Sequence, residues 1–189
     1  MPKVLLVIGD ATEVLDTMYP YFRLPEDGFE VVVAAPEKRL YHMVLHERPP
    51  GWDITQETAG YHLQSDIAFS AVVPGDYAGL FLSGGRAPEY IRLDKRVLEI
   101  VRHFADADKP IAAICHAAQL LAAAGVLKGR SCSCYPAVAP EVTSSGGTYV
   151  ELAMDEAITF GNLVTAPAWP AHPAWLAQFL KVLGTRIEL

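Results

Sequence analysis

Short apolar runs that end at a turn and precede a helical segment are the feature that most constrains the fold of this chain. The first run covers residues 3–8 and stops at Gly9 and Asp10. Because it is apolar throughout instead of alternating, it is typical of a central parallel strand that helices cover on both faces. Residues 13–24 then carry apolar side chains at helical spacing, and residues 29–35 have the composition of a second strand. This order predicts a β-α-β unit.

The same alternation continues along the rest of the chain. It predicts strands at residues 77–82, 110–114, 131–135, 157–160 and 163–166, and helices at residues 97–105, 116–124 and 175–183. Gly125 is expected to end the middle helix, and Gly161 with Asn162 supplies the turn of a hairpin. We therefore expect a single α/β domain over residues 1–189, with a mostly parallel sheet.

Residues 36–61 break this pattern. The stretch 47–53 contains turn-forming residues and an aromatic side chain but has no clear period. It is expected to be a long loop, and a long loop inside a compact domain is often functional. Trp52 and His42 are therefore candidates to line a pocket. The alternative is that the segment is a surface excursion.

The composition argues against several classes of protein. A formal charge of −7, without a block of lysine or arginine, would repel nucleic acid and an anionic membrane surface. The longest weakly polar stretch, residues 111–127, falls short of the ~20 apolar residues of a membrane span. No export signal is apparent, so we expect a cytoplasmic protein. Cys132 and Cys134 are too close for an easy mutual bridge, and the three thiols are expected to be free.

Cys115 lies between a predicted strand and a predicted helix. The turn would expose its side chain at the carboxyl edge of the sheet, where open α/β folds bind their ligands. The positive end of the following helix would lower the pKa of the thiol and favour the thiolate, which is the nucleophilic form. A cysteine can equally be a small buried hydrophobic residue. The residues around Cys115 decide between the two.

Two further groups are expected at the same edge. Gly84 and Gly85 follow the strand at 77–82, and their backbone N–H groups can approach a ligand closely enough to form an oxyanion site. Glu13 follows the first strand, and a carboxyl group held against a thiol can shuttle protons. Taken singly, Glu13 would be an acid at a helix N-terminus and the glycines an ordinary turn. Together with Cys115 they indicate a cysteine-dependent enzyme.

Several segments carry a resemblance to a known family. They are residues 19–20 (YP), 84–90 (GGRAPEY), 109–116 (KPIAAICH) and 125–130 (GVLKGR). On these motifs the chain resembles the PfpI (ThiJ/PfpI) family of the class I glutamine-amidotransferase-like superfamily over nearly its whole length. The segments 9–10 (GD) and 171–173 (AHP) make it particularly similar to the glyoxalase III and deglycase branch. The resemblance implies a flavodoxin-like, three-layer sandwich around the mostly parallel sheet.

The resemblance also implies roles for individual residues. It implies that Cys115 is the nucleophile, that Glu13 is its carboxyl partner and that the backbone N–H groups of Gly85 and His116 are the oxyanion donors. His172 falls where the glyoxalase III and deglycase branch has a pocket histidine. Gly84 and Trp52 are further candidates for the substrate pocket. The chain departs from the family at Ala117, where glycine is usual, and in a longer loop over residues 41–52. Ala117 is expected to be tolerated if its backbone is helical, and the longer loop leaves the substrate open.

Three functions fit these residues, and the first of them has two variants. As a glyoxalase, the Cys115 thiolate would add to methylglyoxal or glyoxal and Glu13 would move a proton between the adjacent carbons, which releases lactate or glycolate. The same first step on an early sugar-derived adduct is deglycation. As a peptidase, Cys115 and His116 would form a triad with Glu89 of a neighbouring subunit, although adjacency alone does not bring His116 within the ~2.6–3.2 Å that a base needs. The third is a redox-sensing or chaperone stress protein without turnover.

No cofactor is expected. The sequence has no phosphate-binding loop and no dinucleotide fingerprint. The pairs His42 with His46 and Cys132 with Cys134 lack the spacing of a four-ligand zinc site, so no metal is expected either. The resemblance implies a homodimer or higher homo-oligomer whose partner is a small dicarbonyl or a glycated adduct.

Overall fold

A seven-stranded sheet forms the centre of the protein in the computed structural model, which describes residues 1–185. The strand order is β10-β11-β7-β6-β1-β2-β5, and every neighbouring pair is parallel except β10 with β11. These strands are β1 (Lys3–Val7), β2 (Glu30–Ala35), β5 (Ile67–Ala68), β6 (Gly79–Leu82), β7 (Ile111–Ile114), β10 (Ile158–Phe160) and β11 (Leu163–Ala166). The helices are α1 (Val14–Glu26), α2 (Ala87–Ile91), α3 (Lys95–Asp106), α4 (Ala118–Ala124), α5 (Ala139–Ser144) and α6 (His172–Val182).

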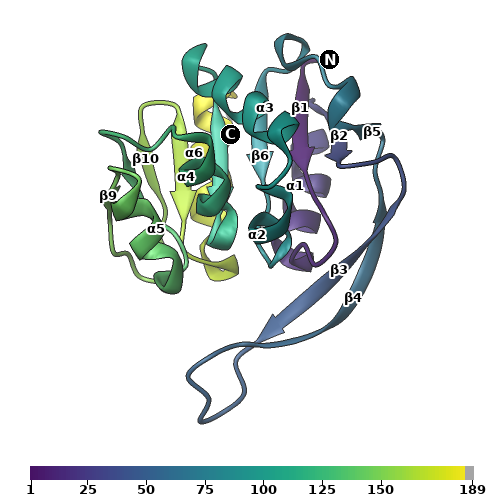
Figure 1. Cartoon of the computed structure of the whole chain (residues 1–189). Coiled ribbons are helices and arrows are strands. Elements are labelled where there is room, and N and C mark those ends of the chain that lie inside the picture. Colours follow the sequence, from purple (N-terminus) through teal and green to yellow (C-terminus); the bar gives the residue numbers. More distant parts are fainter. Residues whose placement is uncertain (186–189) are drawn as a thin grey trace.

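Helices cover both faces of the sheet, which gives three layers (Figure 1). Side chains of β1 alternate between two cores: Leu5 and Val7 pack with α3 and α4, whereas Leu6 packs with α1 and α6. Because both faces are covered, the strand is apolar at every position. The predicted α/β class with a mostly parallel sheet is confirmed. Within residues 1–185, no helix combines the length and apolar character needed to cross a membrane.

The strand predicted at residues 131–135 is wrong beyond its first two residues. Only Ser131–Cys132 is a strand, β8, and it pairs in parallel with β9 (Thr148–Tyr149) in a separate sheet. Residues 133–135 instead run past β11 and the end of β7. Ser133 N donates to Thr165 Oγ1 in β11, and Tyr135 N donates to the carbonyl oxygen of Cys115, directly after β7. This path brings Tyr135 beside Cys115.

The segment expected to be a long loop, residues 36–61, is largely a β-hairpin. The strands β3 (Leu40–Glu47) and β4 (Gln56–Gln64) pair antiparallel in a sheet of their own, which extends from the body of the molecule (Figure 1). We call β3, β4 and the tip at residues 48–55 the arm. Its base is fixed to the turn after β1, since Ala11 N donates to His42 O at 2.8 Å and Val44 N donates to Thr12 O at 2.9 Å. The turn-forming residues therefore make up only the tip.

Candidate active site

Cys115 occupies a strained turn directly after β7. Its φ is +59°, in the left-handed region that a residue with a Cβ adopts only at a cost of about 1–2 kcal/mol. The chain then enters a 3-10 turn (Cys115–Ala117) that leads into α4, and Ala117 has helical dihedrals of −61° and −20°. The expectation that Ala117 fits a helical backbone is thus confirmed. The turn presents the thiol at the carboxyl edge of the sheet.

The two glycines after β6 allow this turn to pack closely against its neighbour. A Cβ on Gly84 would lie 2.6 Å from the Cβ of Cys115, which is closer than carbon atoms can approach. Gly85 has a φ of +81°, and its backbone N–H and that of His116 are near enough to the Cys115 thiol to favour its ionised form and lower its pKa. The structure thus brings both backbone donors to the sulfur atom.

His116 reaches the thiol, contrary to what adjacency in the sequence suggested. Its Nδ1 lies 3.2 Å from Cys115 Sγ, and its ring stacks on Tyr135 with centroids 5.1 Å apart. Burial lowers the pKa of His116, and the neighbouring His46 adds to this effect. The imidazole is therefore neutral at pH 7 and able to take a proton from sulfur.

The expected low pKa of the thiol is wrong. Burial raises the pKa of Cys115 well above its ordinary value, and the nearby charge of Asp16 raises it further. The backbone N–H groups of Gly85 and His116 oppose this but do not overcome it. Desolvation dominates because Cys115 is buried at the floor of a pocket, and the turn offers mainly backbone dipoles in compensation. Cys115 therefore rests as a thiol and needs a base to become nucleophilic.

Glu13 is the N-cap of α1, and its carboxyl group is buried. Its Oε2 accepts a hydrogen bond from Asp16 N at 2.7 Å, and the nearby backbone N–H of His46 favours the ionised carboxylate and so opposes the rise in its pKa. Burial raises the pKa of Glu13 from 4.5 to about 8, with a further contribution from the charge of Asp16. At pH 7 Glu13 thus carries a proton that it can give to a substrate.

Asp16 was missed in the sequence and is the nearest carboxylate to this group. It is 1% exposed, and its Oδ1 lies 2.8 Å from His172 Nε2. The ring of His172 also stacks between Tyr19, at 5.5 Å, and Trp175, at 5.9 Å. Asp16 lies three residues after Glu13, a spacing that places two side chains on the same side of a helix. That spacing was the signal in the sequence that could have identified Asp16. His172 therefore acts on the site through Asp16.

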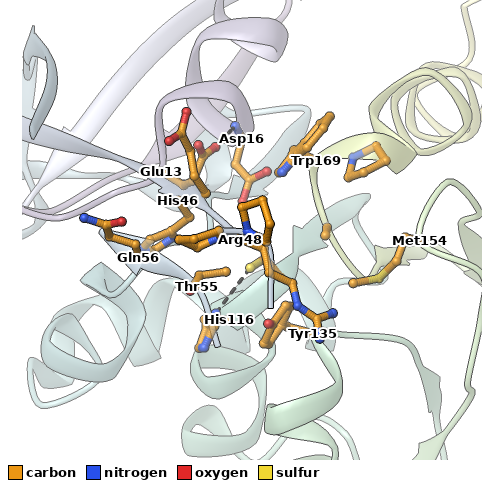
Figure 2. Close-up of a pocket in the computed structure, with 16 residues that line it drawn as sticks. Glu13, Asp16, His46, Arg48, Thr55, Gln56, His116, Tyr135, Met154 and Trp169 are labelled. Atoms are coloured by element: carbon orange, nitrogen blue, oxygen red, sulfur yellow. Dashed lines mark hydrogen bonds between the residues drawn. The ribbon is translucent and has the colours of Figure 1, made fainter. Parts of the chain in front are cut away.

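A pocket of about 710 Å³ opens over Cys115 (Figure 2). Its wall comes from the turn after β7, from the start of α1, from the arm, from the segment before α6, and from the single residues Tyr135 and Met154. The residues that border it are Glu13, Asp16, His46, Glu47, Arg48, Pro49, Pro50, Thr55, Gln56, Cys115, His116, Tyr135, Met154, Ala168, Trp169 and Pro170. The arm thus supplies nearly half of the wall. The expectation that this segment lines a pocket is confirmed, although the residues that do so differ from the predicted ones.

Four residues proposed for the pocket do not border it: Trp52, His42, Gly84 and His172. Gly84 is packed against Asp16 and the Cβ of Cys115, and His172 is buried against Asp16. The Trp52 side chain is about half exposed at the arm tip, where its carbonyl oxygen accepts a hydrogen bond from Arg48 Nε. His42 is at the base of the arm, with its Nδ1 3.5 Å from Asp10 Oδ1. Because side chains alternate along β3, His42 and His46 share a face, but only His46 is far enough along the arm to overhang the thiol. The pocket tryptophan is Trp169.

Glu89 lies on α2 at the border of the site. Its Oε1 is 3.5 Å from Arg86 Nε, its side chain is 49% exposed, and its charge raises the pKa of His116 in opposition to burial. Glu89 is therefore close to His116 of its own chain. That Glu89 completes the catalytic triad of a neighbouring subunit stays a prediction. Within residues 1–185, no group of three or more histidine, cysteine, aspartate or glutamate side chains is arranged to hold a metal ion.

The raised pKa of Glu13 makes the stability of the protein depend on pH. Since the folded-state pKa is about 8 and the ordinary value is 4.5, the folded state holds the proton more tightly, and stability falls as pH rises from 4.5 to 8. Replacing Glu13 by glutamine removes this penalty, which amounts to roughly 3 kcal/mol at pH 7. We expect the melting temperature of Glu13→Gln to exceed that of the wild type by more at pH 8 than at pH 5.

Glu99→Gln provides the control for that measurement, because it makes the same chemical change at an exposed position on α3. If the melting temperatures of Glu13→Gln and the wild type differed by the same amount at pH 5 and at pH 8, this result would contradict a neutral, buried Glu13.

Comparisons with known proteins agree with this architecture. The model of the DJ-1/PfpI family matches residues 2–182. Protein DJ-1 homolog D of Arabidopsis thaliana is 39% identical over 98% of this chain, which spans 49% of that protein. Deglycase PfpI of Pyrococcus furiosus is 35% identical over 96% of the chain and 99% of its own length. The crystal structure of Drosophila melanogaster DJ-1beta, at 21% identity, covers 97% of this chain and 91% of its own with a TM-score of 0.79, which shows the same fold. The chain belongs to the DJ-1/PfpI family.

Proposed function

We propose that this protein is a cysteine-dependent, cofactor-independent enzyme that converts reactive dicarbonyls such as methylglyoxal and glyoxal to hydroxy acids. The observation that carries the proposal is that the Cys115 thiol, a neutral His116 at 3.2 Å and a protonated Glu13 border one pocket, with the backbone N–H groups of Gly85 and His116 beside the sulfur atom. Addition of a thiol to an aldehyde needs a base for sulfur and an acid for the carbonyl oxygen. The pocket supplies both.

The first step forms a hemithioacetal. His116 takes the proton of the thiol, sulfur attacks the aldehyde carbon of methylglyoxal, and the carbonyl oxygen takes up the electron pair. The backbone N–H groups of Gly85 and His116 stabilise the developing charge on sulfur and oxygen. Glu13 then donates its proton to this oxygen and becomes a carboxylate. The neutral resting state of Glu13 is thus used in the first step.

The second step moves a hydrogen between the two carbons. The Glu13 carboxylate removes the proton from the carbon attached to sulfur and returns it to the neighbouring carbon. His116 gives the proton that it took from the thiol to the ketone oxygen, which becomes the alcohol, and the hydroxyl group of the hemithioacetal returns its proton to Glu13. The product of this shift is a thioester of lactate on Cys115. Water then cleaves the thioester, so that methylglyoxal and one water give lactate.

Deglycation of early sugar adducts is the second candidate. Relatives from Pyrococcus and Thermococcus carry the name deglycase at 34–35% identity. The cavity of about 710 Å³ lies in the range of pockets that bind drug-sized ligands, and it has room for an adduct much larger than methylglyoxal. The first attack by Cys115 would be the same in both reactions.

The test is the consumption of methylglyoxal by the purified protein in the absence of glutathione. Wild type should form lactate, and Glu13→Gln should be slower by about 100-fold because it can neither donate nor remove a proton. Lactate formation that survives in Glu13→Gln would remove Glu13 from the mechanism. No turnover by the wild type would reject the proposal in favour of a sensing or chaperone role, and Cys115-dependent cleavage of unfolded protein would favour a peptidase.

A further inference from the structure

The arm carries an imidazole–carboxylate pair that the mechanism above does not use. His46 Nε2 lies 3.1 Å from Glu57 Oε2, and His46 borders the pocket over Cys115. We propose that His46 is the general base that activates water to hydrolyse the Cys115 thioester, with Glu57 as its positioning residue. This inference rests on the proposed function, and it assigns that function's last step to a residue of the arm.

The register of the arm builds the pair. His46 on β3 and Glu57 on β4 are directly opposite in the antiparallel ladder, and side chains at such positions are close enough to interact. Glu57 Oε2 also lies 3.5 Å from Arg86 Nε, in the segment that leads into α2. Contacts with both the body of the protein and the arm therefore hold the Glu57 side chain in place. A histidine fixed in this way keeps one ring orientation.

His46 also lies close to the catalytic groups on its other side. Its backbone N–H is near enough to the carboxyl group of Glu13 to lower the pKa of that group, and its ring is near enough to His116 to lower the pKa of that residue. The close-up shows His46 between Glu13 and His116 (Figure 2). Its side chain is 11% exposed, so the imidazole is enclosed by the pocket wall. Water that attacks a group on Cys115 would therefore pass within its reach.

Three other candidate bases of the site, His116, Asp16 and Glu13, are already engaged. His116 Nδ1 is 3.2 Å from the sulfur, where it serves as the proton acceptor of the thiol, and Asp16 is paired with His172. Glu13 finishes the hydrogen shift with its proton restored and is again an acid. In the part of the chain that the structure describes, the His46 ring has a hydrogen bond only through Nε2, to Glu57. With Nε2 as donor to Glu57, Nδ1 is the free basic nitrogen.

The step balances with water as the only co-reactant. His46 takes a proton from water, whose oxygen forms a bond to the thioester carbonyl carbon. The carbon–sulfur bond breaks, and its electron pair returns to sulfur, which the N–H groups of Gly85 and His116 stabilise as a thiolate. The carboxylic acid leaves as its anion, one proton goes to solvent, and the proton on His46 returns to sulfur. The resting thiol is thereby restored.

Trapping of the thioester tests the proposal. His46→Gln is mixed with methylglyoxal, quenched in acid and analysed by intact mass. A hemithioacetal falls apart once free methylglyoxal is removed, whereas a thioester persists in acid and is cleaved by hydroxylamine. We expect His46→Gln to form the adduct at close to the wild-type rate, to accumulate it on Cys115, and to make lactate about 100-fold more slowly in the steady state. A residue that merely supports the fold would not cause the thioester to accumulate.

His62→Gln is the matched control, because His62 is an exposed histidine on the same arm that does not border the pocket. Glu57→Gln keeps an oxygen acceptor but loses the charge, and it should accumulate the same adduct if His46→Gln proves unstable. Wild-type turnover in both variants, or loss of the first turnover in a folded His46→Gln, would overturn the proposal. Absence of turnover in the wild type would instead overturn the proposed function, and this inference with it.

Discussion

Replacing Cys115 by alanine should lower the turnover of methylglyoxal by at least about 10⁴-fold, because the thiol is the nucleophile and no other group at the site can form the covalent intermediate. The protein should remain folded. Cys115 is 8% exposed, and alanine removes only one atom at the pocket floor. The change keeps the unfavourable φ of +59°, so we expect a melting temperature near that of the wild type. Lactate formation without glutathione, measured on both proteins, checks this result.

Cys132→Ala is the control for a lost thiol. Cys132 is fully buried in the core on the face of α3 and α4, and burial raises its pKa to about 12. A thiol in that state is inert at neutral pH, so this variant should keep its turnover and lose a little stability. Equal activity of Cys115→Ala and the wild type would exclude a nucleophilic Cys115.

Gly85→Ala is the second substitution with a large expected effect. Gly85 has a φ of +81°, and an added Cβ would lie 2.5 Å from Glu13 N and 2.9 Å from Thr12 C, both of which belong to the backbone. Neither atom can move without displacing the N-terminus of α1. We expect a loss of roughly 2–5 kcal/mol in the free energy of unfolding, measured by urea denaturation. The surviving folded fraction should lose about 10²- to 10³-fold in turnover, because the backbone donor to the reacting atoms is displaced.

Gly28→Ala separates the two causes of this loss. Gly28 has nearly the same φ, +82°, but a Cβ there would meet nothing within 4 Å. It should cost only the backbone penalty of about 1–2 kcal/mol and leave turnover unchanged. If Gly85→Ala were no more harmful than Gly28→Ala, the contact between Gly85 and the turn after β1 would not matter for the site.

The parts of the site that follow from strand order could be predicted from the sequence. Glu13, Gly85 and Cys115 each follow one of three adjacent parallel strands, β1, β6 and β7. The carboxyl ends of parallel strands meet at one edge, so an apolar run followed by a turn was enough to place all three together. The local sequence pattern was sufficient for this prediction because the position of each of these residues is determined by the strand that precedes it.

The remaining parts depend on contacts between distant segments. The arm exists because β3 and β4 pair with each other, and His46 becomes a pocket residue only when that pairing places it over the thiol. The pKa of Cys115 was predicted in the wrong direction for a related reason. A helix end is visible in sequence, whereas the desolvation that raises the pKa depends on how completely other segments enclose the sulfur.

The arm has a consequence for how members of this family diverge. The nucleophile and its backbone donors are set into the ends of central strands, where a single added methyl group is not tolerated, as at Gly84. Nearly half of the pocket wall comes from the arm, a two-stranded projection in which an insertion at the tip would leave the central sheet untouched. Reactivity and substrate preference are therefore encoded in separable stretches of the gene. Evolution, or a protein engineer, can exchange the tip to change the substrate while the catalytic turn is inherited intact.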